Sequence, residues 1–357
     1  MKLKNPHLLL LCMVLFCAAC GEKEISIRGI YGSPRSLWNE GIRLDDYAIN
    51  AVFVYSGAID SAMINRARDE GARVYSEFAT LNGKGYVEKH PEAWPINERG
   101  EREPAATWFM GVCPTDPGFK AYRMKLLREL ITKFDLAGIW MDYVHWHAQF
   151  EDPEPILPET CFCDNCLASF EADTGIDVPD GSTAERAGWI LDNRDPQWRD
   201  WRCSVIVDWA RDMKTIIREI RPDALLGVYH CPWDDAEFDG ARRRILGLDF
   251  GDLAGVVDAF SPMVYHGRMG RKPEWVEEYV GWFCRQMELK SDGKKKVWPI
   301  VQAHDEPYEI SADEFETVLL GGVTGTADGV MMFTVRSIAE SYAKAAVLKR
   351  IYNEMVK

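Results

Sequence analysis

The sequence predicts an α/β fold, a (β/α)8 or TIM barrel, formed by one domain with long loops after its third and fourth strands. Strand-like segments rich in β-branched and aromatic residues alternate with helix-like segments along the chain, which is typical of a parallel sheet. Eight such pairs can be traced. The alternative is an open, doubly wound sheet, but no Gly-rich dinucleotide fingerprint follows the first strand.

The strand-like segments are short and apolar, and each is followed by a helix or a helix-sized connection. The eight expected strands are residues 24–33, 47–57, 73–81, 137–143, 224–233, 256–267, 297–306 and 327–335. The expected helices include residues 60–72, 117–135, 196–220, 236–248, 274–289, 311–320 and 338–357. Asp60 or Ser61 is a candidate cap for the helix that follows the second strand. Two long connections, 82–117 and 147–195, follow the third and fourth strands.

The N-terminal segment has the pattern of a secretory signal rather than of a folded element. A basic start is followed by an apolar stretch over 8–16 and by small residues before Cys20. The end of this segment resembles a bacterial lipobox, which implies a signal at 1–19 and a lipidated Cys20 at the start of a catalytic domain, 20–357. We therefore expect an exported lipoprotein that is anchored to a bacterial membrane by acyl chains and faces the periplasm or the cell surface. An ordinary cleaved signal peptide is the alternative.

The composition narrows the class of partner. The chain carries 42 basic and 56 acidic residues, a formal net charge of −14, which argues against nucleic acid as a partner. Aromatic residues make up 11% of the chain, including 13 Trp and 13 Tyr. Flat apolar rings stack on sugar faces, although most of them belong to the core of any protein. We expect an oligosaccharide or polysaccharide as substrate, and no organic cofactor.

In a barrel of this type the reactive groups lie at the carboxyl ends of the strands and on the loops that follow. Nearly all of the expected strand ends carry polar or aromatic residues, and this convergence predicts an active site. The candidates for substrate binding are Tyr31, Tyr143, His145, Trp146, His230, Trp233, Asp235, Tyr265, His266, Gln302, His304 and Arg336. His147 is a further candidate for orienting a sugar hydroxyl.

Asp142 stands out because it lies inside the apolar run "GIWMDYVHW" (138–146). A buried carboxylate is costly unless it has a partner or a role. An architectural ion pair with Arg336 or a histidine is one explanation. The other is glycoside hydrolysis, which needs two carboxyl groups, one to protonate the leaving oxygen and one to attack or to activate water.

We expect Asp142 to be the nucleophile or base, and the acid to come from another strand end. The candidates for the acid are Glu306 and Asp305 together, then Glu77, then Asp235. Glu306 and Asp305 are expected across the barrel mouth from Asp142, and Glu77 on the neighbouring strand. Glu77 and Asp305 could instead hold sugar hydroxyls without transferring protons.

Four cysteines form the second informative group. Cys161, Cys163 and Cys166 lie within six residues of one another, and Cys113 lies upstream. Four thiolates suffice for a closed, tetrahedral, structural zinc site that would join the loop after strand three to the loop after strand four. Disulfides are the alternative in an oxidising compartment. The tight Cys-x-Cys-x-x-Cys spacing favours a metal, because disulfides between such close residues are strained.

These segments resemble known families over roughly residues 70 to 335. Residues 113–146 together with "CFCDNCLASF" (161–170) resemble the catalytic domains of barrel glycoside hydrolases. The cysteine pattern is similar to the zinc-binding cysteines of the family 42 β-galactosidases, where the cluster also lies after strand four. "GIWMDYVHW", "SPMVYHG" (261–267) and "VWPIVQAHDE" (297–306) resemble bacterial glycoside hydrolase-like lipoproteins with Gly-h-h-h-Asp-Tyr strands, where h is a hydrophobic residue.

The chain departs from family 42 at the end of the fourth strand. Those enzymes carry an Asn-Glu pair there, and the Glu is the acid, whereas this chain has Asp142 and Tyr143. The family's catalytic assignment and β-galactoside specificity are therefore not carried over. An Asp at this place is similar to the nucleophile position of several α-glycosidase barrels, which implies an α-linked or unusual substrate.

Two other functions remain open at this point. Because a fold does not fix a function, the chain could be a carbohydrate-binding lipoprotein without activity. It could also be a metal-dependent hydrolase such as a deacetylase, which requires a His/Asp triad around an open site away from the cysteines. The sequence does not identify the sugar, the linkage or the anomeric outcome.

Overall fold

The computed structural model describes residues 24–291 and 295–356. The predicted signal at 1–19 and the predicted lipidation site, Cys20, lie outside the described residues. Within these residues no helix is both long and apolar enough to cross a membrane.

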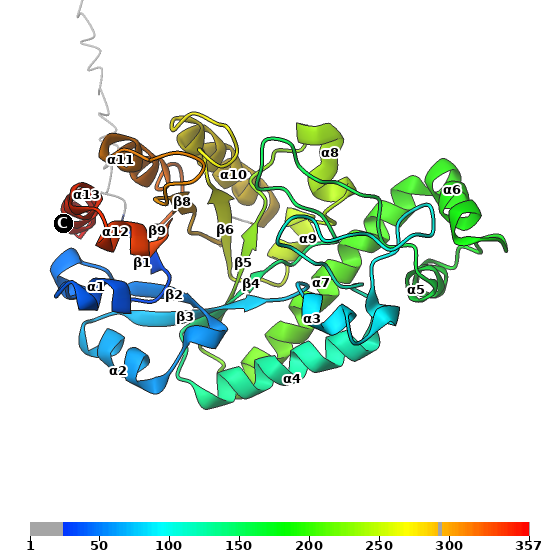
Figure 1. Cartoon of the computed structure of the whole chain (residues 1–357), viewed down its shortest axis with the longest axis horizontal. Helices are drawn as coiled ribbons and strands as arrows, with labels where there is room; N and C mark the ends of the chain where they lie inside the picture. The colour runs from blue at the N-terminus through cyan, green and yellow to red at the C-terminus, as the bar shows by residue number, and fades with distance from the viewer. Residues whose placement is uncertain (1–23, 292–294, 357) are drawn as a thin grey trace, which may run out of the picture.

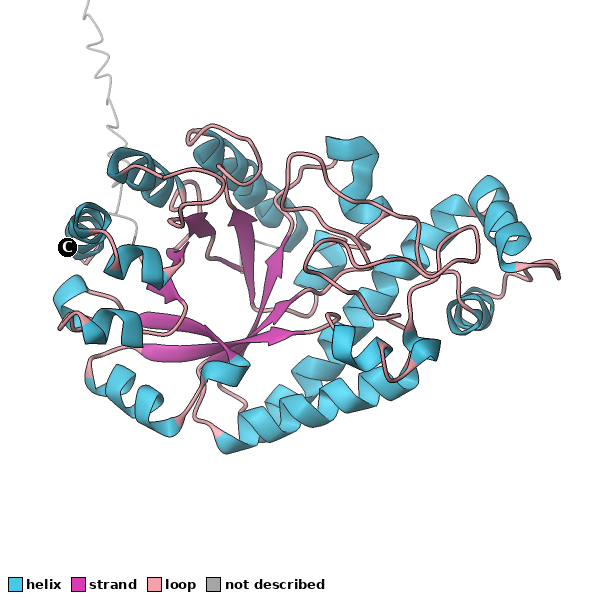
Figure 2. Cartoon of the chain, in the orientation of Figure 1, coloured by secondary structure: helices cyan, strands magenta, loops and turns pink. Residues whose placement is uncertain are grey.

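The described chain forms a closed parallel barrel surrounded by helices, as predicted (Figures 1 and 2). The strands are β1 (Ile27–Tyr31), β2 (Ala51–Tyr55), β3 (Arg73–Ala79), β4 (Gly138–Asp142), β5 (Leu225–His230), β6 (Ala259–Val264), β7 (Lys296–Val297), β8 (Ile300–Gln302) and β9 (Gly329–Phe333). β1 pairs with both β2 and β9, and β5 pairs with β6, so the sheet has no free edge. β7 and β8 both pair with β6 and form one barrel strand, interrupted at Pro299, which has no N–H to donate.

Helices follow the strands and cover the outside of the barrel (Figure 1). The α-helices are α1 (Arg35–Asn39), α2 (Ser61–Asp69), α3 (Lys84–Val87), α4 (Pro117–Lys133), α5 (Asp164–Thr174), α6 (Thr183–Asn193), α7 (Asp195–Ile220), α8 (Glu237–Arg244), α9 (Phe250–Ala254), α10 (Trp275–Ser291), α11 (Ala312–Gly321), α12 (Val335–Ala339) and α13 (Tyr342–Glu354). Short 3-10 helices are η1 (Asp45–Tyr47), η2 (Ser56–Ala58) and η3 (Pro91–Ala93).

Local sequence signals fix where the early helices begin. The side chain of Asp60 accepts a hydrogen bond of 2.8 Å from the backbone N–H of Met63, so the predicted cap of α2 is Asp60. Helix α4 starts with Pro117, and Asp116 accepts a 2.6 Å bond from the Phe119 N–H. These caps end the connections that lead away from the barrel mouth.

Large rings fill the barrel interior below the mouth. Trp140 of β4 stacks on Trp298 with ring centres 5.5 Å apart, and Phe53 and Tyr75 pack at its edge. Glycine makes the room for them, since a Cβ on Gly227 would lie 2.1 Å from a ring atom of Trp140. The apolar part of the fourth strand is therefore core, and the strand reaches the mouth only at its last residue.

The two long connections cover one side of the mouth. They meet at an isolated bridge between Asn97 and Thr160. His147 joins them again, because its Nδ1 accepts a 3.0 Å bond from the Gly111 N–H and its Nε2 lies 3.0 Å from the Pro104 carbonyl oxygen. Helices α5 and α6 lie beyond the barrel, beside the start of α7 (Figure 1).

Candidate active site at the barrel mouth

Two carboxyl groups touch at the carboxyl ends of neighbouring strands. Asp142 is the last residue of β4, and Glu77, which is 4% exposed, lies near the end of β3. Their side chains share a hydrogen bond. The Tyr31 hydroxyl, at the end of β1, donates to Glu77 Oε2. The backbone N–H of Tyr143 donates to Asp142 Oδ1 at 2.8 Å.

Both carboxyl groups of this pair have raised pKa values. Burial, and then the nearby charges of Glu77 and Glu151, raise the pKa of Asp142 well above its ordinary value. Burial also raises the pKa of Glu77, but the hydrogen bonds from Tyr31 and Asp142 oppose that rise. Two adjoining carboxyl groups resist simultaneous ionisation. Burial and the charge of Glu77 favour the protonated form of Asp142, whose pKa is raised well above its ordinary value.

Tyr143 holds an unusual backbone conformation beside this pair. Its φ is 51°, in the left-handed region that side chains rarely adopt. Its ring stacks on Phe109 of the first connection, with centres 5.4 Å apart and planes at 9°. Burial and the neighbouring Asp142 raise the pKa of its hydroxyl, so this group stays a neutral hydrogen-bond donor.

A cavity of about 270 Å³ opens beside Asp142. Its walls come from β1, β4, β5, β6, β8, β9 and the two connections: Tyr31, Trp108, Asp142, Tyr143, Glu151, Tyr229, Met263, Tyr265, Arg268, Ile300 and Phe333. This mixture of rings and a few polar groups is typical of a small-ligand site.

A third carboxylate, Glu151, faces the same cavity. Its side chain is 13% exposed and pairs with Arg268 at 2.8 Å. Burial raises the pKa of Glu151, and the Arg268 guanidinium opposes this rise. Arg268 also lies 4.7 Å over the ring of Trp108. The cavity therefore has a carboxyl group of raised pKa at Asp142 and a second carboxyl group at Glu151, which pairs with Arg268.

The structure brings together the candidates that end the early strands and β6. Glu77, Asp142, Tyr31, Tyr143 and Tyr265 all line the mouth cavity or the groove beside it. His145 lies next to them, with Nδ1 2.7 Å from the Trp146 carbonyl oxygen. Burial lowers the pKa of His145 to about 4, so its ring is neutral at physiological pH.

The candidates predicted across the mouth lie elsewhere. The expected seventh strand ends at Gln302, so Asp305 and Glu306 fall in a loop outside it. Asp305 pairs with Lys344 at 2.5 Å, and Glu306 is exposed. Arg336 lies in α12, where its side chain is 77% exposed and pairs with Glu340. Within residues 24–291 and 295–356, the structure thus provides no opposed carboxylate on this side and no Arg336–Asp142 ion pair.

The candidates after the fifth strand, and Trp146, are also turned away from the cavity. His230 is buried among Phe250, Phe260 and Phe283, which lowers its pKa to about 3. Asp235 forms an ion pair with Arg242. Trp233 is buried, with its ring against Phe150 and Phe238. Trp146 is fully buried and donates to the Arg202 carbonyl oxygen at 3.1 Å.

The remaining candidates, Gln302, His304 and His266, do not line the mouth cavity. Gln302 accepts a 3.1 Å bond from the Arg268 N–H and donates to the Glu306 carbonyl oxygen at 2.7 Å, so it positions the loop that carries Arg268. His304 packs against Tyr265, and burial lowers its pKa to about 4. His266 is fully buried, 3.9 Å from Glu314.

Several residues of the cavity were not predicted. Glu151 lies within the connection after β4, where no periodic pattern marks it. Arg268 follows β6 by four residues and could have been found by reading further past the strand end. Tyr229 precedes the last residue of β5 and faces the barrel interior, so strand alternation could have found it.

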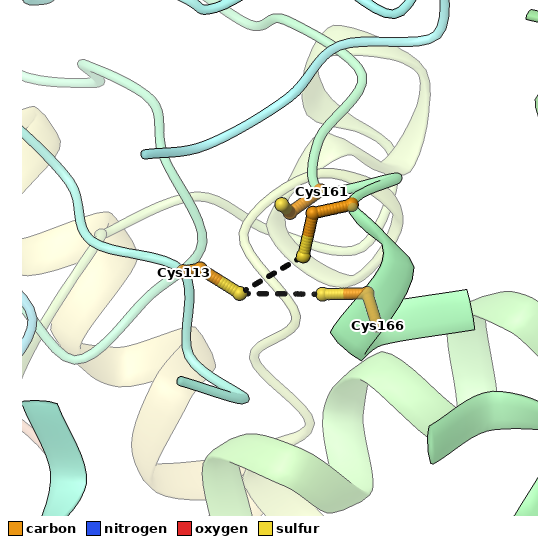
Figure 3. A group of neighbouring side chains, drawn as sticks. Cys113, Cys161 and Cys166 are labelled. Carbon is orange, nitrogen blue, oxygen red and sulfur yellow. Dashed lines mark hydrogen bonds between the residues drawn. The ribbon is translucent and has the colours of Figure 1, made fainter. Parts of the chain in front are cut away.

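The four predicted cysteines converge in one place. The Sγ atoms of Cys113, Cys161, Cys163 and Cys166 all lie within 4.8 Å of one another, and none of the four forms a disulfide. Cys113 Sγ is 3.4 Å from Cys163 Sγ and 3.5 Å from Cys166 Sγ. Figure 3 shows the sulfur atoms of Cys113 and Cys166 facing each other, with Cys161 beside them.

This arrangement fits a metal ion. Four sulfur ligands about 2.3 Å from one zinc ion lie a little under 4 Å apart in a tetrahedron, which is close to the spacing observed. The cluster is closed, because three of the cysteines are buried and Cys163 is half-buried. Among residues 24–291 and 295–356, no other group of three or more His, Cys, Asp or Glu side chains is close enough to share an ion. The His/Asp triad of a metal-dependent hydrolase is therefore not assembled in that part of the chain.

No protein-family model matches the sequence, and no curated protein matches it either. Solved structures match its fold. The glycoside hydrolase domain of PgaB (BpsB) from Bordetella bronchiseptica is similar with a TM-score of 0.66 at 14% identity, over 90% of this chain and 98% of that one.

Two β-galactosidases are also similar. The enzyme from the psychrophilic Marinomonas ef1 has a TM-score of 0.66 at 11% identity, over 91% of this chain and 59% of that one. Gan42B, a GH42 β-galactosidase from G. stearothermophilus, has a TM-score of 0.63 at 13% identity, over 94% of this chain and 57% of that one. The chain thus spans little more than half the length of the two β-galactosidases. At these identities the likeness shows the (β/α)8 barrel fold and does not establish an activity.

Proposed function

We propose that the protein is a glycoside hydrolase that cleaves a periplasmic or cell-surface glycan at the mouth of its barrel. The observation that carries the proposal is the set of three carboxyl groups: the hydrogen-bonded pair Glu77–Asp142 and, on the same cavity as Asp142, Glu151. Two carboxyl groups in different protonation states are what this reaction requires. The similarity of the fold to glycoside hydrolase domains is consistent with it.

In this mechanism Asp142 is the proton donor, which revises the expectation that it acts as nucleophile or base. Its proton passes to the glycosidic oxygen as the bond from that oxygen to the anomeric carbon breaks. Glu77, held by Tyr31, accepts a hydrogen bond from Asp142 and orients its carboxyl group. Water later returns the proton to Asp142.

Glu151 supplies the second carboxylate. It either takes a proton from a water molecule as that water attacks the anomeric carbon, or attacks this carbon itself and is released by water in a second step. Arg268 favours the ionised form that both roles need. The neutral hydroxyls of Tyr143 and Tyr265 are available to hold sugar oxygens.

We also propose that the four cysteines hold a structural zinc ion. The metal would join Cys113, from the connection that carries Trp108, to Cys161, Cys163 and Cys166, from the connection that carries Glu151. It would thereby fix two walls of the cavity without taking part in the reaction. Export and lipid attachment at Cys20 complete the proposal, on the strength of the N-terminal sequence alone.

The test is glycan release by purified residues 21–357 across a broad panel of polysaccharides and oligosaccharides. Asp142→Asn is the inactive variant, and Glu306→Gln, which changes an exposed carboxylate outside the mouth, is its matched control. Activity in the parent and the control but not in Asp142→Asn is the expected result. Proton NMR of the first product then identifies a retaining or inverting mechanism. Glycan binding without release by the parent would contradict the proposal and favour a binding protein.

A further inference from the structure

A second cavity adjoins the carboxyl pair on the side away from Glu151. This groove, of about 660 Å³, shares Tyr31 and Tyr143 with the mouth cavity and has Glu77 in its wall. From there it extends over the ends of β2 and β3 to one side of α4. A glycan bound across the carboxyl pair would therefore occupy both cavities, one on each side of the bond to be cleaved.

Three cations line this groove, although the chain as a whole is strongly acidic. They are Arg123 and Lys133 of α4 and Lys84 of α3. None of them forms an ion pair with a carboxylate within the residues that the structure describes. The carboxylates of the groove are already engaged, because Glu77 accepts from Tyr31 and Asp142, and Glu129 lies 3.8 Å from Lys125.

Arg123 is the best placed of the three to hold a ligand. Its guanidinium lies 4.2 Å over the Phe78 ring, and its Nη2 donates to the Ala79 carbonyl oxygen. Its Nε–H is buried and has no hydrogen-bond partner. A guanidinium that is taken out of water without an anion is costly, and a ligand carboxylate or sulfate would relieve that cost.

Exposed rings stand beside Arg123. Tyr55, at the end of β2, is 53% exposed, and Tyr122 of α4 is 45% exposed. Both line the groove, and both hydroxyls lie close enough to Arg123 to interact with its charge. Exposed tyrosine rings are suited to stacking on sugar faces. The groove thus combines surfaces for sugar rings with donors for an anionic substituent.

We propose that this groove is a subsite for a negatively charged sugar, so that the substrate is an acidic glycan that carries carboxylate or sulfate groups. The inference rests on the proposed function, because it takes the carboxyl pair between the two cavities as the point of cleavage. It deepens that function by naming the substrate class. Lys84 and Lys133 would steer the chain into the groove, and Arg123 would hold one charged unit next to Glu77.

Binding to the inactive Asp142→Asn protein tests this inference. The probes are hexasaccharides that share a backbone and differ in charge: oligogalacturonate with its methyl ester, and hyaluronan with its carboxyl-reduced form. Calorimetry should give a dissociation constant about tenfold lower for at least one acidic form than for its neutral partner. The preference should shrink in high salt, since exposed charges are screened.

Variants assign the preference to the groove. Arg123→Gln should remove most of the preference for the acidic form. Lys84→Gln or Lys133→Gln should weaken binding of the acidic form by about two- to fivefold. Arg128→Gln, on the same helix but outside the groove, is the matched control and should leave binding unchanged, because Arg128 pairs with Glu219 of α7. If Arg123→Gln does not fold by circular dichroism, the double variant of Lys84 and Lys133 takes its place.

Equal affinity for acidic and neutral forms, no binding of any acidic form at millimolar concentration, or an acidic preference that survives the groove variants would each overturn the inference. The panel of glycans separates this failure from that of the proposed function. Release confined to neutral glycans would support the proposed hydrolase and contradict the acidic subsite. A preference for acidic glycans that depends on the groove, without release of any glycan, would support the subsite and contradict the proposed hydrolase.

Discussion

The four cysteines and the three carboxyl groups differ in how they are held together. Three of the cysteines lie within six residues of one another, and the cluster is closed and shielded from solvent. Glu77, Asp142 and Glu151 come from two strands and a long connection, and they face open cavities. Only the barrel brings the carboxyl groups together, whereas close sequence spacing assembles most of the cysteine cluster.

This difference agrees with the proposed structural role of the cysteines and the proposed chemical role of the carboxyl groups. A closed cluster of ligands without access for a substrate stabilises the chain around it. A buried carboxyl pair of raised pKa beside an open cavity costs stability, and such groups cluster at functional sites. The two are connected, because the connections that carry the cysteines also carry Trp108 and Glu151. Changes to the carboxyl groups should therefore affect activity first, and changes to the cysteines should affect stability first.

The largest effect is expected at the proton donor. Asp142→Asn keeps the shape of the side chain and removes its acidic proton, so kcat should fall by about 10³-fold or more on the natural glycosidic bond. Glu306→Gln should retain the parent's kcat. Equal losses in the two variants would break the assignment of the mouth as the active site. Initial rates of glycan release give the measurement.

The second-largest loss of activity is expected at Glu151. Glu151→Gln removes the group that attacks or activates water, and kcat should fall by about 10²-fold or more. The melting temperature should change little, because Gln can still accept a hydrogen bond from Arg268. A variant with the parent's kcat would show that the second carboxyl group lies elsewhere and would return attention to Glu77.

Changes to the cysteine cluster should reduce stability and metal content. Cys166→Ser removes one of four ligands, so the protein should lose its zinc and about 3 kcal/mol or more of its free energy of unfolding. Plasma mass spectrometry and denaturant titration measure the two quantities. The matched control is Cys203→Ser, a buried cysteine outside the cluster. It should keep one zinc per chain, and an equal metal content in both variants would contradict the zinc site.

The pH dependence of kcat/KM should report the carboxyl groups of the mouth. Asp142 must be protonated, so activity should be lost as the pH rises through its raised pKa. Glu151 must be ionised, so activity should be lost as the pH falls through its own raised pKa. Removing the cation with Arg268→Gln should move the acidic limb upward by about one pH unit. An acidic limb that does not move would separate Glu151 from the reaction.

The smallest effect concerns stability. The folded-state pKa of Asp142 lies above its unfolded value, so its contribution to stability is present at low pH and is lost as the pH rises through the folded pKa. Asp142→Asn should therefore melt about 2–4 °C higher than the parent at neutral pH. The difference should shrink as the pH falls and vanish below about pH 3, where the unfolded chain also holds its proton. Scanning calorimetry at the two pH values checks this expectation.

The parts that sequence could predict are those fixed by local patterns. The barrel, the cap at Asp60, the convergence of the four cysteines and the position of Asp142 at the end of a strand all follow from alternation, spacing and chain order. The predicted end of the seventh strand was wrong. Pro299 interrupts the barrel strand, and its second part ends at Gln302. This shorter strand leaves Asp305 and Glu306 in an outer loop.

The features of the site that the sequence could not predict depend on tertiary packing. Glu151 lies in a connection without regular periodicity, and only the fold of that connection brings it to Arg268. The histidines were expected as sugar ligands because they follow strands. His230 and His266 are instead buried. His230 packs among the rings of Phe250, Phe260 and Phe283, and His266 lies beside Glu314. A polar residue at a strand end can face the barrel mouth or the surrounding helices, and the side that it takes depends on residues distant in sequence.

The most direct test of the central claim compares leaving groups. With the sugar identified by the panel, the Asp142→Asn variant is assayed on the natural glycosidic bond and on an aryl glycoside whose phenol is acidic enough to leave without protonation. If Asp142 is the proton donor, the variant should lose about 10³-fold on the natural bond and stay within about tenfold of the parent in forming the first product from the aryl glycoside. Equal losses on both substrates would contradict the account and make Asp142 the nucleophile or base.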